Sequence, residues 1–469
     1  MHLKAAFRAQ VIIVKTVAIA AFSCAAWAPP AFSETISEAV RRAVLNNNAR
    51  KAAIASIEAQ GNQVGIAQGA RAPSIALFGE AAAETVDDPS SLSLADNDDL
   101  KLARQLSLGV EFPLLDGMRS LNAVYREATL LDAEIIRLSD ETETLALNAV
   151  QAYIDVARHR RVVALADRNI RVHQRIRGQV EQQVVGGSLP EADLLSADDK
   201  VFEARLAKAE AEAALGNALS SFQFVVGTPP RGALSLTSNG VLPRSVAAAE
   251  AAAVANSFRL KVAQKEIEAL TYKGKIDDAE WRPKVSLFAG AEVGHDLDGS
   301  SGHEETLRAG VRLNWTLHQG KKRAATAARN HDLVMRAHYR KKQMEGEVRD
   351  FVRRSWNTYR TSAERRGLLT RSVENSTQIA AAYSRDFEAA KRPLLQVLDA
   401  ERDLFNLKVQ LINAEAATAF QSYRVLAAQN TLARHFGLSA ANRALIPNYE
   451  ARVKAEPRKG FDISTPDLQ

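Results

Sequence analysis

The residues best suited to chemistry are gathered in one short stretch of the second half of the chain. Two histidines and four carboxylates, all groups that bind divalent metals, occur close together as His295, Asp296, Asp298, His303, Glu304 and Glu305. Their spacing matches no metal-ligand template, and the stretch lacks the full EF-hand pattern. We therefore interpret it as a solvated extracellular loop, and we predict neither a metal site nor a cofactor.

Outside this stretch the sequence carries no catalytic constellation. It has no nucleophile elbow, no phosphate-binding P-loop and no zinc-binding helix motif. The single cysteine, Cys24, lies near the N-terminus, so the rest of the chain has neither a thiol nucleophile nor a disulfide. We predict that the protein is not an enzyme. A net charge of +6 over 469 residues is mild, and with no nucleic-acid-binding module we predict no nucleic-acid partner.

The N-terminal segment, residues 1–33, has the features of an export signal. Lys4 and Arg8 precede an apolar run over residues 11–28, and Ala31-Phe32-Ser33 suits a cleavage site. Cleavage is expected between about residues 28 and 33, after which Cys24 is lost. Retention as a membrane helix and lipidation of Cys24 are the alternatives, although the residues before Cys24 lack the usual leucine.

The remainder of the chain contains two copies of one sequence pattern. Ala72-Pro73 returns as Arg282-Pro283, each before an alternating apolar stretch, and the motif around Pro190 returns around Pro393. We predict a first repeat over 34–230, a linker over 231–245, a second repeat over 246–438 and an irregular C-terminal tail over 439–469. The repeat is too long for a solenoid unit.

Each repeat is expected to contain a helix, two strands and a long pair of helices. In the first repeat, helices are predicted over 34–70, from Gly117 to 185, and back to 226, with strands over 73–84 and 106–114. In the second, helices are predicted over 246–280, 321–390 and back to 436, with strands over 284–294 and 306–317. Ser188 is expected to cap the returning helix. Apolar residues in steps of three and four along 124–156 indicate coiled-coil packing.

The four strands require partners from other copies of the chain. Each has one apolar and one polar face, which is typical of strands in an outer-membrane barrel. Four strands cannot close a barrel, because single-chain barrels begin at about eight, and an open edge in lipid leaves backbone groups without hydrogen bonds. Two copies would give eight strands and a plugged interior, whereas three would give twelve and room for water.

In its motifs the chain resembles the TolC-type outer-membrane channel proteins. The resemblance covers residues 34–438 and rests on three features: the duplicated plan, the motif Phe112-Pro113-Leu114-Leu115-Asp116-Gly117, and the run from Leu394 to Asn406. It implies a mainly α fold with β: coiled-coil helices in a periplasmic α-barrel, and four strands per chain in a trimeric, twelve-stranded transmembrane β-barrel with internal duplication. It further implies a homotrimer in outer-membrane lipid. The helix tips would dock onto a periplasmic adaptor and an inner-membrane pump, either an ABC transporter or a proton-driven pump.

The resemblance also assigns roles to residues at the helix tips. Adaptor contacts are expected at Gly186, Gly187, Ser188, Leu189 and Lys391. At the position of Ala390 the family usually has glycine, which puts the second contact in doubt. A latch between helix pairs is expected from Arg392 to Asp193, and Phe387 stands where the family has a tyrosine. Asp399 is expected to form a pore constriction, with Gln396 in place of a second acidic ring.

These observations predict a passive exit channel for substrates delivered by a pump and an adaptor. The run from Leu394 to Asn406 resembles members that serve type I protein secretion more than those that serve drug efflux. Multidrug or metal efflux is the first alternative. The second is a periplasmic coiled-coil scaffold without a barrel.

Overall fold

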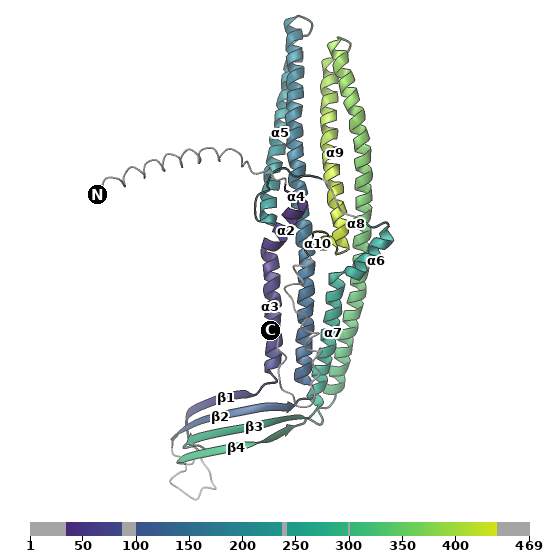
Figure 1. Ribbon diagram of the computed structural model, residues 1–469. Coiled ribbons are helices and arrows are strands. Elements are labelled where there is room, and N and C mark those ends of the chain that lie inside the picture. The colour runs from purple at the N-terminus through teal and green to yellow at the C-terminus, as the bar shows by residue number, and fades with distance from the viewer. Residues whose placement is uncertain (1–33, 87–99, 237–241, 299–300, 439–469) are drawn as a thin grey trace, which may run out of the picture. The chain divides into compact units, whose positions relative to one another are not determined.

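The computed structural model describes residues 34–86, 100–236, 242–298 and 301–438. The predicted signal segment, the C-terminal tail and the acidic stretch 87–99 lie outside the described residues. Figure 1 shows long helices and a β-sheet. The sheet has four strands. None of the helices within the described ranges has both the length and the hydropathy needed to cross a bilayer.

The predicted order of elements is found in both repeats. The first contains α2 (Ile36–Asn46), α3 (Asn48–Gly69), β1 (Ser74–Glu84), β2 (Lys101–Leu115), α4 (Arg119–Val185) and α5 (Glu191–Val226). The second contains α6 (Val246–Asn256), α7 (Phe258–Asp278), the short 3-10 helix η1 (Ala279–Trp281), β3 (Lys284–His295), β4 (His303–Asn314), α8 (Lys322–Glu388), α9 (Leu394–Ala428) and α10 (Leu432–His435).

Three predicted helices are interrupted in the structure. The helix predicted over 34–70 breaks at Asn47, whose side chain accepts a hydrogen bond from the Ala49 amide at 2.8 Å and so starts α3. The helix predicted over 246–280 breaks at Ser257, which caps α7 through the Leu260 amide. The last returning helix stops at Ala428, and Asn430 then takes a left-handed φ of 54° before α10. The sequence prediction of continuous helices was wrong at these positions.

Two strand boundaries also differ from the prediction. β2 begins at Lys101, earlier than the predicted residue 106, and β4 occupies 303–314 where 306–317 was predicted. His303, Glu304 and Glu305 are therefore strand residues and not loop residues.

The chain divides into two compact units, and each draws segments from both repeats. The first unit contains residues up to 43, 148–239 and 361–420, and the second contains 44–147, 240–360 and residues from 421 onward. The boundaries predicted for the repeats stay a prediction. The two repeats nevertheless share one sheet, because β1 and β2 come from the first and β3 and β4 from the second.

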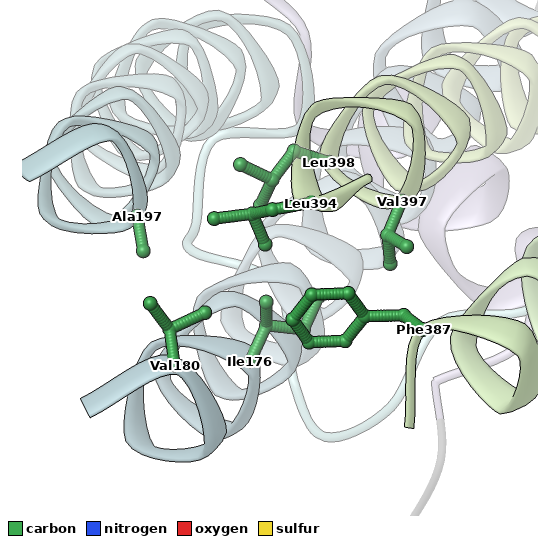
Figure 2. Close-up of a cluster of buried hydrophobic side chains, with 7 residues drawn as sticks. All are labelled: Ile176, Val180, Ala197, Phe387, Leu394, Val397 and Leu398. Atoms are coloured by element: carbon green, nitrogen blue, oxygen red, sulfur yellow. The ribbon is translucent and has the colours of Figure 1, made fainter. Parts of the chain in front are cut away.

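Apolar clusters stabilise each unit, and the cluster of the first unit joins helices from both repeats. In the first unit, Figure 2 shows a cluster built from α4, α5, α8 and α9, made up of Ile176, Val180, Ala197, Phe387, Leu394, Val397 and Leu398. In the second unit, Val64 of α3 packs against Val124, Ala128 and Leu131 of α4. The spacing of the α4 residues is the three-and-four pattern read from the sequence, and burying each such side chain contributes about 1.5–3 kcal/mol.

The sheet belongs to the second unit and has two different faces. Its four strands are antiparallel in the order β1-β2-β3-β4, so that Leu77 pairs with Leu108, Leu108 with Ala291, and Ala291 with Leu307. On the face that these residues share lie exposed apolar side chains, namely Ile75, Leu77, Leu106, Leu108, Leu287, Val293, Leu307, Val311 and Leu313. The opposite face carries most of the polar residues, namely Glu80, Glu84, Gln105, Ser107, Glu111, Ser286, Glu292, Thr306, Arg308 and Arg312.

The structure of the turn between β2 and α4 explains why it contains Asp116 followed by Gly117. Asp116 Oδ2 accepts a hydrogen bond from the Ser120 amide at 2.7 Å, which satisfies a free donor at the start of the helix. Gly117 has a φ of 67°, and a Cβ there would lie 2.7 Å from Cβ of Arg282. A glycine is therefore required both by the backbone conformation and by the close approach of Arg282.

Candidate functional site

The candidate site consists of the two helix turns of the first unit. The first turn joins α4 to α5. Gly187 has a φ of 73°, and the amide of Ser188 donates to the Gln183 carbonyl at 2.8 Å, which closes the C-terminus of α4. α5 then begins at Glu191 with Pro190 in the cap position and no side-chain cap. The prediction that Ser188 caps α5 was therefore wrong, and Leu189 packs at the edge of the apolar cluster instead.

The second turn, between α8 and α9, adopts the same conformation without a glycine. Ala390, the equivalent of Gly187, has a φ of 53°, and the Lys391 amide donates to the Asp386 carbonyl at 2.8 Å. This repeats the hydrogen bond of the first turn. Lys391 and the first-turn residues thus lie on equivalent turns, and their adaptor role stays a prediction.

Arg392 is held by residues of its own helix pair. Its guanidinium lies 3.3 Å from Asp386 Oδ2, donates to Gln396 Oε1 at 2.5 Å, and stacks 3.6 Å from the centre of the Tyr383 ring. The contacts recorded for Arg392 within the chain do not include Asp193, which lies half-buried in the first turn of α5. The predicted latch between Arg392 and Asp193 stays a prediction about neighbouring copies.

The sequence analysis missed Tyr383 and Asp386, two side chains of α8 that contact Arg392. Phe387 is buried in the apolar cluster, so it lies away from the polar contacts of Arg392. Tyr383 lies one helical turn before it, and a ring at this spacing faces the same side of the helix. The aromatic contact with Arg392 therefore comes from the preceding turn.

The predicted constriction residues lie in the first two turns of α9. Gln396 is bound to Arg392, and Asp399 Oδ1 lies 3.1 Å from Nη1 of Arg402 in the next turn. The side chain of Asp399 is 42% exposed, so its carboxylate remains open to solvent. Glu401, two residues further on, is partly buried. Burial raises its pKa, and the positive charges of Lys408 and Arg175 oppose this shift. The pore role of Asp399 and Gln396 stays a prediction.

A second buried acid, Glu143 of α4 in the second unit, gave no signal in the sequence. Its carboxylate accepts hydrogen bonds from the amides of Leu432 at 3.0 Å and Ala433 at 3.1 Å, which fixes the start of α10. Burial raises the pKa of Glu143 to about 7, with a smaller contribution from Asp140, while the two amides and Arg434 oppose the shift. Because α10 lies far away in the sequence, no local pattern could have paired it with Glu143.

The described histidines of the histidine- and acid-rich stretch lie close to neighbouring carboxylates. His295 Nδ1 lies 2.9 Å from Asp296, and His303 Nε2 lies 3.0 Å from Glu305. Asp296 also accepts a hydrogen bond from the Gly302 amide at 3.0 Å. Across the described part of the chain, no three histidine, cysteine or acidic side chains are grouped so as to hold a metal ion.

Comparison with known proteins identifies similar sequences and similar folds. Residues 251–435 match the family model described as "Outer membrane efflux protein". The chain is 25% identical over 446 residues to the outer membrane efflux protein BepC of Brucella suis biovar 1 (strain 1330), covering 93% of each chain.

Two solved structures show the shared fold. CusC, described in a study of folding and transmembrane channel formation, is 16% identical with a TM-score of 0.72, over 84% of this chain and 92% of that chain. The CmeC outer membrane channel of Campylobacter jejuni is 14% identical with a TM-score of 0.71, over 85% and 86%. These folds combine long helices with a short antiparallel sheet, as predicted from the sequence.

Proposed function

We propose that the chain belongs to the outer membrane efflux protein family of TolC-type channels, with its helices in the periplasm, and that it is a passive exit channel for a partner pump. Members of this family are channels and not enzymes. The observation that carries the proposal is the four-stranded sheet, whose apolar face is exposed and whose two edges are unpaired among the described residues. We reject the alternative of a periplasmic scaffold without a barrel, because the exposed apolar face of the sheet would then have no lipid to contact.

Three copies of the chain complete the sheet. An unpaired edge in lipid costs several kcal/mol for each unsatisfied backbone group, and four strands are too few to close a barrel. Three copies supply twelve strands with the apolar face toward lipid and the polar face toward a water-filled interior. Channels of the family are homotrimers that work with an adaptor and an inner-membrane pump.

The helices of the first unit also favour association. α5 exposes large apolar side chains, namely Leu195, Phe202, Leu206 and Phe224. On α8, the segment 361–388 exposes Leu368 and Ile379. Exposed apolar residues at helical spacing on a long helix are typical of a surface that packs against another helix. We assign these two surfaces to contacts between copies.

Transport through the channel is passive. The sequence has no nucleotide-binding motif, so the free energy must come from the partner pump. The two helix turns, with Gly186, Gly187, Ser188, Leu189 and Lys391, are the proposed contacts with the periplasmic adaptor. Arg392 and Asp193 of neighbouring copies are the proposed latch, and Asp399 with Gln396 is the proposed constriction.

For the cargo we propose a protein delivered by an ABC transporter, as in type I secretion. The support is the run from Leu394 to Asn406, which resembles secretion members of the family. The second candidate is a multidrug or metal efflux system with a proton-driven pump. It is favoured by the relative from Brucella suis, which is described as an efflux protein.

A deletion strain separates the two cargo proposals. If the channel serves secretion, loss of the chain removes one or more proteins from the culture medium and leaves the growth-inhibiting concentrations of drugs and metals unchanged. If it serves efflux, the strain becomes more sensitive and its secreted proteins stay the same. Expression of the wild-type chain in the deletion strain is the control for both measurements.

The channel itself is tested by two substitutions at neighbouring positions of β2. Leu108 lies on the apolar face and Ser107 on the polar face. An arginine on the lipid face costs about 2–4 kcal/mol per copy at the bilayer midplane, so Leu108→Arg should prevent insertion. Ser107→Arg should insert and form a heat-modifiable trimer that conducts ions in planar bilayers. A wild-type protein that remains a water-soluble monomer after export would contradict the proposed function.

A further inference from the structure

The two open edges of the sheet carry opposite charges on the polar face. On β1, this face presents Glu80 and Glu84, whereas on β4 it presents Arg308 and Arg312, with Glu304 at the loop end. β1 pairs only with β2 and β4 only with β3 within the described residues. An acidic edge and a basic edge on one sheet are complementary, so two copies can join edge to edge with charges paired.

We propose that β4 of one copy pairs antiparallel with β1 of the next, with Arg308 opposite Glu80 of the partner subunit. The inference rests on the proposed trimer and goes beyond it, because it fixes which residues meet at the seam. The occupant of each open edge is therefore a second copy of this chain.

The lengths of the two strands fit this register. β1 spans Ser74–Glu84 and β4 spans His303–Asn314. With Arg308 opposite Glu80, Ser74 lies opposite Asn314 and Glu84 lies opposite Glu304, so every residue of β1 gains a partner. This pairing satisfies the backbone groups along both edges, which the lipid environment requires.

The two faces of the sheet restrict the register further. A shift by one residue would bring the apolar face of one copy beside the polar face of the next, because side chains alternate along a strand. Shifts by two residues keep the faces aligned but place Glu80 opposite Gly310 or Thr306. Charge favours the register in which Glu80 directly faces Arg308, since directly opposed charges interact most strongly.

The environment of Arg308 distinguishes it from Arg312. Arg312 is held within the chain, because its guanidinium stacks 4.7 Å from the centre of the Phe288 ring. Arg308 lies 3.9 Å from Glu292, at the outer limit of an ion pair, and its side chain is 69% exposed. Arg308 can therefore turn toward the open edge while Arg312 keeps its contacts.

A glycine next to the seam gives independent support. On the chain's own side, Phe288 covers Gly310, since a Cβ at Gly310 would lie 3.1 Å from Phe288 Cζ. In the proposed register Phe78 of the partner subunit lies directly opposite Gly310, and its exposed ring can cover the other side. Aromatic side chains beside edge glycines are a known device for fixing strand register. One like-charge contact, between Glu84 and Glu304, remains at the loop end of the seam and offsets part of the gain.

Disulfide cross-linking tests the register directly. In a variant with Cys24→Ser, the pair Glu80→Cys and Arg308→Cys should oxidise to covalently linked trimers that survive boiling without reductant. A bond within one copy is excluded, because β1 and β4 are separated by two strands, roughly 14 Å, and a disulfide needs Cβ atoms about 4 Å apart. The matched controls are Ser74→Cys with Arg308→Cys, six residues out of register, and Leu77→Cys with Arg308→Cys, on opposite faces.

Each outcome decides one part of the inference. Cross-linking of the 80/308 pair with little in either control supports the seam. Stronger cross-linking of the 74/308 pair, or heat-modifiable trimers without cross-links at 80/308, would overturn the register but leave the channel intact. Failure of the wild-type chain to form trimers would instead overturn the proposed function.

Charge reversal provides a second measurement that needs no cysteine. Glu80→Arg should lower the temperature at which the trimer separates, and the added substitution Arg308→Glu should restore most of the loss. Equal destabilisation by the single and double variants would contradict a direct contact between these residues.

Discussion

The contacts of Arg392 within its own chain favour its proposed contact with a neighbouring copy. Asp386, Gln396 and Tyr383 fix its guanidinium, so little side-chain entropy is lost if it also binds Asp193 of a neighbouring copy. We predict that Arg392→Ala and Asp193→Ala each raise single-channel conductance in planar bilayers. Asp386→Asn, which loosens the arginine without removing it, should have a smaller effect. Unchanged conductance in both alanine variants would exclude the latch.

Asp399 is expected to set the affinity of the channel for cations. Three carboxylates in a narrow aqueous passage attract divalent cations, and Arg402, at 3.1 Å, weakens the field of each one. Asp399→Ala should therefore reduce block by divalent cations, whereas Arg402→Ala should increase it. If both variants retained wild-type block, Asp399 would not line the constriction.

The backbone conformation of Ala390 is less favourable in free energy than the same conformation at Gly187. Both residues have a left-handed backbone, which disfavours any side chain with a Cβ. Ala390→Gly should raise the free energy of unfolding by about 0.5–1 kcal/mol, and Gly187→Ala should lower it by a similar amount. Thermal unfolding in detergent measures both. A destabilised Ala390→Gly variant would show that the methyl group makes a contact that outweighs the strain.

Among whole elements, α10 has a buried carboxylate, that of Glu143, bound to the first two of its backbone amides. Burial raises the pKa of Glu143 to about 7, above its value in an unfolded chain, so the folded protein binds the proton more tightly. Stability from this group is therefore greatest below about pH 4.5 and is lost as pH rises to about 7. We predict that Glu143→Gln flattens the dependence of the melting temperature on pH between 5 and 7.5.

Two comparisons complete the Glu143 experiment. The stability of the variant relative to the wild type should improve as pH rises from 5 to 7.5, because glutamine has no carboxyl group to ionise in the buried site. Glu210→Gln, at an exposed position of α5, should leave the slope unchanged. A slope in Glu143→Gln equal to that of the wild type would assign the pH dependence to other groups.

The sequence predicted elements with a sustained period and missed contacts between distant segments. The alternation through Leu106, Leu108 and Val110 identified β2, and the heptad pattern identified α4, because each reflects one buried or lipid-facing side. The helix break at Asn47 had a local signal, a capping residue within a run of three asparagines. The contact of Glu143 with α10 had none, since it depends on how two distant helices pack.

In the candidate site, Arg392 also has contacts that depend on the folded geometry and not on a local sequence pattern. Its place beside a turn was predicted from the repeat, and its pairing with Asp386 could have been proposed from their closeness in sequence. The stacking on Tyr383 could not be chosen over other rings without the turn geometry, because the left-handed residue Ala390 sets where the arginine leaves the helix.

At the scale of the whole molecule, the exposed apolar surface of α5 is the proposed contact between the helices of neighbouring copies. Phe202 and Leu206 lie one turn apart, both more than 60% exposed, and the helix around them is rich in carboxylates such as Asp199 and Glu203. The segment of α8 proposed to meet it exposes Leu368 between Arg365 and Arg371. The two surfaces are thus complementary in their apolar residues.

This complementarity predicts different results for two substitutions on α5. Phe202→Glu places a carboxylate in the apolar contact and should lower the temperature at which the trimer separates, since burying an unpaired charge is costly. Glu210→Gln should change it little, because rim charges contribute at most about 1 kcal/mol. Migration of unheated samples in gels, after incubation over a range of temperatures, measures both. If Phe202→Glu trimers were as heat-resistant as the wild type, α5 would face solvent in the assembly, and the sheet alone would have to hold the three copies together.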